Sequence, residues 1–132
     1  MNKTEIMNIP ISSLAYLGDA AIEVLVRRRI ITGAECRHGE HPSAVSLAYV
    51  TAQAQSAAVE RILPYLTEDE TDIFKRGRNC VHSGVPKHAT VAEYRRATGL
   101  ECVFGYLYLT GDGERADELF RLAYPESIGA EE

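Results

Sequence analysis

Two carboxylates occupy positions that the surrounding sequence marks as apolar. Asp19 and Glu101 each lie within a stretch whose other members are apolar or small, and each has a glycine nearby, Gly18 and Gly105 respectively. Burying an unpaired carboxylate costs several kcal/mol, so each acid needs a cation, a set of strong hydrogen-bond donors or a proton. The glycines let two backbones approach closely. We therefore expect the two acids to face each other and to share a divalent ion.

Oxygen ligands of this kind select a hard cation. Mg²⁺ is commonly held by one or two carboxylates, together with water and a substrate phosphate. Such an ion can activate water and stabilise the charge on a phosphate under attack. Thr98, one turn before Glu101, would hold a metal-bound water through its hydroxyl. The competing interpretation is that Asp19 and Glu101 each pair with an arginine, for example Arg95 or Arg96.

Other titratable side chains near these positions have simpler interpretations. Glu23, one turn after Asp19, is either a further acid beside the metal or the partner of Arg27 in an i,i+4 ion pair, and we favour the pair. Cysteine and histidine gather in two polar segments, but their spacing fits no common structural zinc pattern. These residues are Cys36, His38 and His41 in one segment, and Cys80, His82 and His88 in the other.

The charge of the chain is unevenly distributed. The 14 Lys and Arg against 19 Asp and Glu give a net charge of −5, which at first sight argues against a nucleic-acid partner. Residues 102–132 carry this whole excess, with two basic and seven acidic side chains, so the rest of the chain is neutral. Between positions 75 and 96 only Glu93 opposes six basic side chains, which are Lys75, Arg76, Arg78, Lys87, Arg95 and Arg96.

This basic segment also has two interpretations. A basic loop containing glycine is suited to binding phosphate groups. Alternatively, Lys75 and Arg76 occupy the last turn of a helix, where cations interact favourably with the helix dipole. A charge cluster considered alone favours the second interpretation.

Hydrophobic spacing predicts helices along the whole chain, and therefore an all-α fold. Capping boxes, with threonine at the cap and glutamate three residues later, mark two helix starts. The loop at 79–89 and a flexible tail at 127–132 are expected to be irregular. The predicted helices run from a cap at Ser12 and Ser13 to near Gly33, from Pro42 to just before Pro64, from Thr67 to Gly77, from Thr90 to 106–109, and from a cap at Asp112 onward.

Length and composition are typical of one soluble domain. A chain of 132 residues is of the usual size for a single domain, so we expect one domain over 1–132. Three cysteines with no close pair fit a reducing compartment. The sequence shows neither a signal peptide nor an apolar run long enough to span a membrane. We therefore expect a cytoplasmic protein without a membrane partner.

Several blocks of the sequence resemble one known family. The segment 16–20, Y-L-G-D-A, resembles the signature helix of the ribonuclease III family, and 100–109, L-E-C-V-F-G-Y-L-Y-L, resembles the second carboxylate helix of that family. Four further blocks are similar to elements of its Mini-ribonuclease III subfamily, and together the blocks extend from about position 12 to 122. They are Y-V-T-A-Q-A-Q at 49–55, F-K-R-G-R-N at 74–79, V-P-K at 85–87 and Y-R at 94–95.

This resemblance implies a helical endonuclease domain that works as a homodimer on double-stranded RNA. The family hydrolyses phosphodiesters with Mg²⁺ and leaves a 5′-phosphate and a 3′-hydroxyl. The subfamily lacks a separate double-stranded-RNA-binding domain and trims the precursor of 23S ribosomal RNA. Carried over by position, Asp19 and Glu101 are the catalytic metal ligands. The residues expected to contact RNA are Lys75, Arg76, Arg78, Lys87 and His88.

The sequence also departs from the family pattern. Ala15 and Thr98 stand where the larger ribonuclease III enzymes have acids, which argues against a tightly held second metal. Gln53 and Ser46 stand where basic residues are common in the subfamily. The alternative function is a non-catalytic helical module of the same fold that binds RNA or a protein. Four apolar residues are expected in either the core or the dimer interface: Tyr16, Val24, Phe104 and Leu107.

Overall fold

The computed structural model describes residues 1–33, 41–80 and 89–125, and this part of the chain contains helices and no strand. The prediction of an all-α fold is therefore confirmed. A 3₁₀ turn, η1, lies at Leu63–Tyr65. The α-helices are α1 (Lys3–Met7), α2 (Ile11–Thr32), α3 (Pro42–Val50), α4 (Ala52–Ile62), α5 (Glu68–Arg78), α6 (Val91–Thr110) and α7 (Gly113–Ala123).

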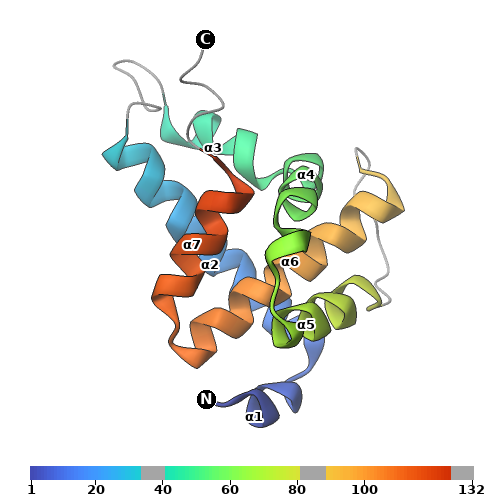
Figure 1. Cartoon of the computed structure of the whole chain (residues 1–132). Helices are drawn as coiled ribbons and strands as arrows, with labels where there is room; N and C mark the ends of the chain where they lie inside the picture. Colours follow the sequence, from blue (N-terminus) through green and yellow to red (C-terminus); the bar gives the residue numbers. More distant parts are fainter. Residues whose placement is uncertain (34–40, 81–88, 126–132) are drawn as a thin grey trace.

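Helix α6 is the central element of the fold. It runs through the middle of the molecule and packs against α2, α4, α5 and α7 (Figure 1). Its side chains Leu100, Val103 and Phe104 are at most 1% exposed. A helix that is apolar on most of its faces must be covered on most of its faces, which explains its central position. One continuous apolar core surrounds it.

The predicted helix starts at Thr67, Thr90 and Asp112 are confirmed. The Thr67 hydroxyl accepts a hydrogen bond from the Glu70 amide at 3.1 Å, and the Glu70 carboxylate accepts one from the Thr67 amide at 2.9 Å. Thr90 and Glu93 form the same reciprocal pair, at 3.0 and 2.9 Å. The Asp112 carboxylate accepts a hydrogen bond from the first turn of α7. These contacts satisfy amides that have no partner within their own helix.

Two predicted boundaries near the ends of helices were wrong. Helix α2 begins at Ile11 after Pro10 and has no side-chain cap, so Ser12 and Ser13 lie inside its first turn. Helix α5 continues through Arg78 and does not end at Gly77. Gly77 is buried against α6, where an added Cβ would come within 2.8 Å of the sulfur of Cys102. Its role is close packing of the two helices.

The single helix predicted between Pro42 and Pro64 was also wrong. The helix is interrupted at Thr51. The hydroxyl of Thr51 accepts a hydrogen bond from the Ala54 amide at 3.2 Å and so caps the start of a new helix. The apolar spacing continues across this break, which is why periodicity alone did not reveal it. The short helix α1 was not predicted.

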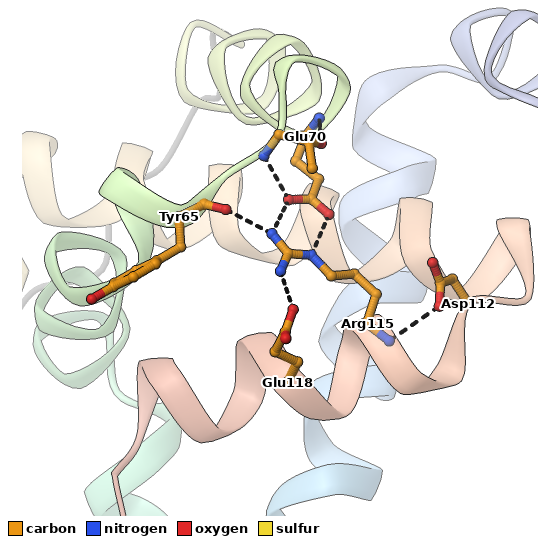
Figure 2. A network of polar contacts seen from close by, with 6 residues as sticks. Tyr65, Glu70, Asp112, Arg115 and Glu118 are labelled. Atoms are coloured by element: carbon orange, nitrogen blue, oxygen red, sulfur yellow. Dashed lines mark hydrogen bonds and ion pairs between the residues drawn. The ribbon is translucent and has the colours of Figure 1, made fainter.

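A polar network fastens α7 to the start of α5 (Figure 2). The guanidinium of Arg115 donates to both carboxylate oxygens of Glu70, at 2.7 and 2.8 Å, and to the Tyr65 carbonyl at 2.7 Å. It also pairs with Glu118. The Glu70 side chain is 3% exposed, so its charge is balanced inside the protein by the arginine. This network fixes the first turns of α7 against the start of α5.

The structure also bears on the predictions about the membrane and the tail. Among the described residues, no helix is both long enough and apolar enough to cross a membrane. The tail at 127–132 lies outside the described residues.

Candidate functional site

The candidate site is built where α2 crosses α6. At this crossing, Gly18, which precedes Asp19, and Gly105, one turn after Glu101, allow the two backbones to approach closely. A Cβ on Gly18 would overlap the carbonyl of Glu101 and lie 2.9 Å from the amide nitrogen of Gly105. A Cβ on Gly105 would overlap the carbonyl of Leu14 and lie 3.2 Å from the Gly18 nitrogen. The expectation that glycines allow this approach is confirmed.

The crossing places the carboxylates of Asp19 and Glu101 next to each other. Burial of Glu101, the negative charge of Asp19 and a hydrogen bond between the two side chains together raise the pKa of Glu101 to about 8. The environments of the two acids differ, because Asp19 is exposed and Glu101 is half-buried. The expectation that Asp19 lies within the core was therefore wrong: α2 turns this residue toward solvent, and its apolar neighbours Leu14 and Ile22 fill the core.

The competing arginine pairs are not formed among the described residues. Neither Asp19 nor Glu101 takes part in an ion pair in that part of the chain. Arg96 instead donates to the Glu60 carboxylate at 3.2 Å and to the Ser56 hydroxyl at 3.3 Å. No arginine among the described residues therefore relieves the repulsion between the two carboxylates. A proton or a bound cation would relieve it.

The chemistry of this donor set fits a hard divalent cation. Both donors are carboxylates, and no group of three or more His, Cys, Asp or Glu side chains suited to a metal occurs in the described ranges. Two carboxylates from one chain leave room for water and a phosphate oxygen in an octahedral shell, as Mg²⁺ prefers. Four of the cysteine and histidine residues considered for zinc, at positions 36, 38, 82 and 88, lie outside the described residues.

Thr98 and Glu23, which were considered for roles near the metal, both form hydrogen bonds with other residues. The Thr98 hydroxyl donates to the carbonyl of Tyr94 at 3.0 Å, and the residue is 4% exposed, so only its lone pairs remain available to a water. Glu23 accepts from Arg27 at 3.0 Å, which is the i,i+4 pair favoured from the sequence.

The predicted RNA-contacting residues of α5 differ in their surroundings. Lys75 is exposed. Arg76 turns toward the N-terminal segment and donates to the carbonyl of Met7 at 3.3 Å. Arg78 lies over the ring of Phe74, with 5.8 Å between the guanidinium carbon and the ring centroid. All three basic residues lie in the last turn of α5, so the favourable contact with the helix dipole is present as well. Lys87 and His88 lie outside the described residues.

A cavity of about 420 Å³ between the end of α5 and the start of α6 adds a feature that the sequence reasoning missed. Arg78 and Arg95 both line it, although they belong to different helices. The sequence marked Arg95 as part of a basic segment, but spacing alone did not show that it shares a cavity with Arg78.

An apolar surface lies beside α2, α6 and α7. Val24 is 65% exposed and Tyr108 66%, and both line a cavity of about 380 Å³ together with Ala116. Of the four residues expected in the core or an interface, Tyr16 and Val24 are exposed. The other two, Phe104 and Leu107, belong to the core.

Comparison with known proteins gives consistent results. The sequence pattern of the Ribonuclease III domain matches residues 12–112. The chain is 44% identical to the Mini-ribonuclease 3 of Symbiobacterium thermophilum, over 89% of each chain. It is 41% identical to the Mini-ribonuclease 3 of Clostridium tetani, over 86% of this chain and 78% of that one. A crystal structure of a Fusobacterium nucleatum protein superimposes with a TM-score of 0.70 at 30% identity, covering 84% of this chain and 89% of that one.

Proposed function

This chain belongs to the ribonuclease III family of endoribonucleases, and from that premise we propose that it cleaves double-stranded RNA with Mg²⁺ held between Asp19 and Glu101. The observation that carries this proposal is the meeting of the two carboxylates at the crossing of α2 and α6. A module that only binds RNA or protein needs no such pair, because burial of Glu101 and the nearby charge of Asp19 disfavour two ionised carboxylates and raise the pKa of Glu101.

The protein's own residues have separable tasks in this proposal. Asp19 and Glu101 would hold the cation. When bound, the cation would supply positive charge that stabilises a phosphate under attack and that favours the ionisation of water. The exposed Lys75 and the guanidinium of Arg78 contact the phosphate backbone, since duplex RNA is recognised mainly by shape and by its phosphates and 2′-hydroxyls. The products carry a 5′-phosphate and a 3′-hydroxyl.

We further propose that the active form is a homodimer. The exposed apolar side chains Val24 and Tyr108 on neighbouring helices offer a surface that a second copy would cover. Such a dimer provides one carboxylate pair for each strand of a duplex.

The proposed natural substrate is the precursor of 23S ribosomal RNA. The support for this proposal is the similarity to Mini-ribonuclease 3 proteins along most of the chain. Such a substrate places the protein in the cytoplasm. The test is incubation with a transcript that contains the terminal stem of the precursor, followed by mapping of the ends; uniform cleavage at many positions would count against a dedicated processing role.

The central prediction concerns Asp19→Asn. This change removes one negative charge from the metal pair at an exposed position, so we expect the variant to fold normally. We expect cleavage of a perfect RNA duplex in Mg²⁺ to fall at least about a hundredfold, since metal catalysis supplies several kcal/mol. Binding of Mg²⁺ measured by calorimetry should weaken in parallel, which tests the metal site independently of cleavage.

Asp72→Asn is the matched control. It makes the same change at an exposed carboxylate on α5 that pairs with Lys3, outside the carboxylate pair, and we expect wild-type cleavage. If Asp19→Asn cleaves as fast as Asp72→Asn, the assignment of the catalytic pair is wrong. If neither the wild type nor the variants cut duplex RNA in Mg²⁺, the non-catalytic alternative is favoured.

A further inference from the structure

A cleft of about 510 Å³ lies where the start of α5, the end of α6 and the start of α7 meet. The residues that line it belong to 67–70 and 106–115, well inside the described ranges. Neither carboxylate of the proposed metal pair lines it, and it shares only Gly111 with the cavity of the apolar surface. The cleft is open to solvent, and the polar side chains in its walls indicate what it could bind.

Tyr106 contributes a hydroxyl that has no hydrogen-bond partner. The residue is 8% exposed and lines the cleft, yet its hydroxyl forms no hydrogen bond among the described residues. That part of the chain contains no fully buried side-chain oxygen or nitrogen that lacks a partner. The Tyr106 oxygen is therefore reached by solvent through the cleft. Burial and the nearby charges of Asp69 and Glu70 raise the pKa of Tyr106, so the hydroxyl stays neutral at pH 7.

The carboxylates at the cleft are only partly balanced by cations. Asp112 is exposed and forms no ion pair within the described ranges. Its Oδ1 accepts the Arg115 amide at 3.1 Å in the cap of α7, which leaves its Oδ2 available to a ligand. Lys3 donates to both Asp69 and Asp72, at 2.7 and 2.9 Å, so one positive charge serves two carboxylates. The cleft therefore favours a cationic ligand.

Arg115 does not make the cleft an anion site. Its guanidinium donates to both carboxylate oxygens of Glu70 and to the Tyr65 carbonyl, and it also pairs with Glu118 (Figure 2). A metal ion is also a poor match, because no group of three or more His, Cys, Asp or Glu side chains suited to a metal occurs in the described part of the chain. The remaining class of cation is an organic one.

We propose that this cleft binds the primary ammonium group of a linear aliphatic diamine or polyamine. An ammonium group donates three hydrogen bonds, and the cleft offers it the Tyr106 hydroxyl, the Asp112 carboxylate and the Thr110 hydroxyl. Thr110 gives its own proton to the Leu107 carbonyl at 3.0 Å, so its lone pairs remain available. The Leu107 side chain and the methyl group of Thr67 line the same cleft and suit the methylene groups of such an amine. Binding at this site does not depend on the proposed function.

The test is a titration of 1,4-diaminobutane into the whole chain in the absence of RNA. Calorimetry measures the affinity, and thermal melting measures the stabilisation that a ligand of the folded state produces. The control solutes are 1,4-butanediol, which has the same length without charge, and sodium chloride at matched ionic strength. We expect saturable binding of the diamine and a rise in melting temperature that neither control solute reproduces.

Paired variants test the assignment of the site. Tyr106→Phe removes only the hydroxyl and should weaken diamine binding about fivefold, whereas Tyr65→Phe, at an exposed ring outside the cleft, should not change it. Asp112→Asn removes the charge but keeps a good helix cap, and should weaken binding about tenfold. Asp117→Asn, on the same helix but outside the cleft, should bind normally. Melting without diamine confirms that each variant is folded.

Four results would overturn the proposal. Absence of saturable binding to the wild type, or stabilisation matched by sodium chloride, would show that the cleft has no specific affinity for an ammonium group. Equal binding by Tyr106→Phe and Tyr65→Phe would show that the unpartnered hydroxyl is not part of the site. Loss of diamine binding in Asp19→Asn would assign the diamine to the carboxylate pair. Cleavage of duplex RNA by the wild type tests the proposed function separately and is unaffected by these outcomes.

Discussion

Glu70 and Glu101 show how surroundings decide the state of a single carboxylate. Burial would raise the pKa of Glu70, but the hydrogen bonds and charge of Arg115 and the backbone amide of Thr67 outweigh burial and bring its pKa below the ordinary 4.5. Glu101 has no cationic partner among the described residues, and burial and Asp19 raise its pKa instead. Glu70 therefore stabilises the fold as an anion, whereas the surroundings of Glu101 favour binding of a proton or a metal ion.

The ionised state of Glu70 predicts how the stability of the protein depends on pH. A group whose folded pKa lies below its unfolded pKa stabilises the protein above the unfolded value, and this contribution is lost as pH falls through the folded pKa. At pH 7 we expect Glu70→Gln to lower the free energy of unfolding by about 2 kcal/mol, moderated because Arg115 keeps Glu118 as a partner. The difference from wild type should shrink steadily as pH falls below 4.5, as measured by urea denaturation.

Glu68→Gln provides the comparison for this prediction. It makes the same change in the same first turn of α5, at an exposed position, and should alter stability by less than about 0.5 kcal/mol at any pH. A destabilisation by Glu70→Gln that stays constant from pH 7 to 3 would show that shape and packing, and not charge, account for the effect.

At the scale of elements, the close crossing of α2 and α6 controls the candidate site. The backbones approach at Gly18 and Gly105, and the carboxylates beside these glycines meet as a consequence. Gly77 and Gly99 serve the neighbouring packing of α5 on α6, where a Cβ on Gly99 would lie 2.7 Å from the Phe74 ring. Helix α6 thus has a glycine at its close approach to α2 and another at its close approach to α5.

Gly18→Ala tests this crossing. The added Cβ would overlap the backbone of Glu101, which cannot move aside as a flexible side chain can, so the two helices must separate. We expect a loss of about 2–4 kcal/mol in the free energy of unfolding, in the range of severe packing defects, and a fall in cleavage, because the carboxylate pair opens.

Gly113→Ala is the matched change at an open position. Nothing lies within 4 Å of a Cβ there, and the residue begins α7, so alanine should be neutral or stabilising by up to about 1 kcal/mol. Equal stability of the two variants would mean that α2 and α6 can accommodate a methyl group and that the crossing does not depend on Gly18.

At the scale of the whole molecule, the negative net charge coexists with local basic surfaces. The acidic excess belongs to residues 102–132, whereas Lys75, Arg78 and Arg95 lie on α5 and the start of α6. Affinity for a phosphate backbone depends on local cations and is screened by salt, so the net charge predicts weak non-specific binding and does not exclude RNA.

The apolar surface leads to a prediction about assembly. Val24→Glu would place a negative charge in the proposed apolar interface, where burial would separate the charge from water. We therefore expect the dimer to dissociate at micromolar concentration. Light scattering coupled to gel filtration would detect a halved mass. Leu47→Glu, at another exposed apolar position on α3, should leave the mass unchanged. A monomeric wild type, or a dimeric Val24→Glu, would contradict the proposed interface.

Features that depend on near neighbours were predictable from the sequence alone. Helix starts at Thr67, Thr90 and Asp112 follow from hydrogen bonds between residues three apart, and the pair of Glu23 with Arg27 follows from one helical turn. Such contacts form wherever the chain is helical and need no other part of the fold. The resemblance to a known family predicted which two acids would hold a metal.

The packing of helices set features that near neighbours do not specify. The meeting of Asp19 and Glu101 was expected from the sequence, but it is the packing of α2 on α6 that brings them together and leaves Asp19 exposed. The turn of Arg76 toward Met7 and the shared cavity of Arg78 and Arg95 also depend on how helices lie against one another. Apolar periodicity predicts that a helix has a buried face, but it does not predict which other helix covers that face. The covering helix is determined by how the side chains of all the helices pack together.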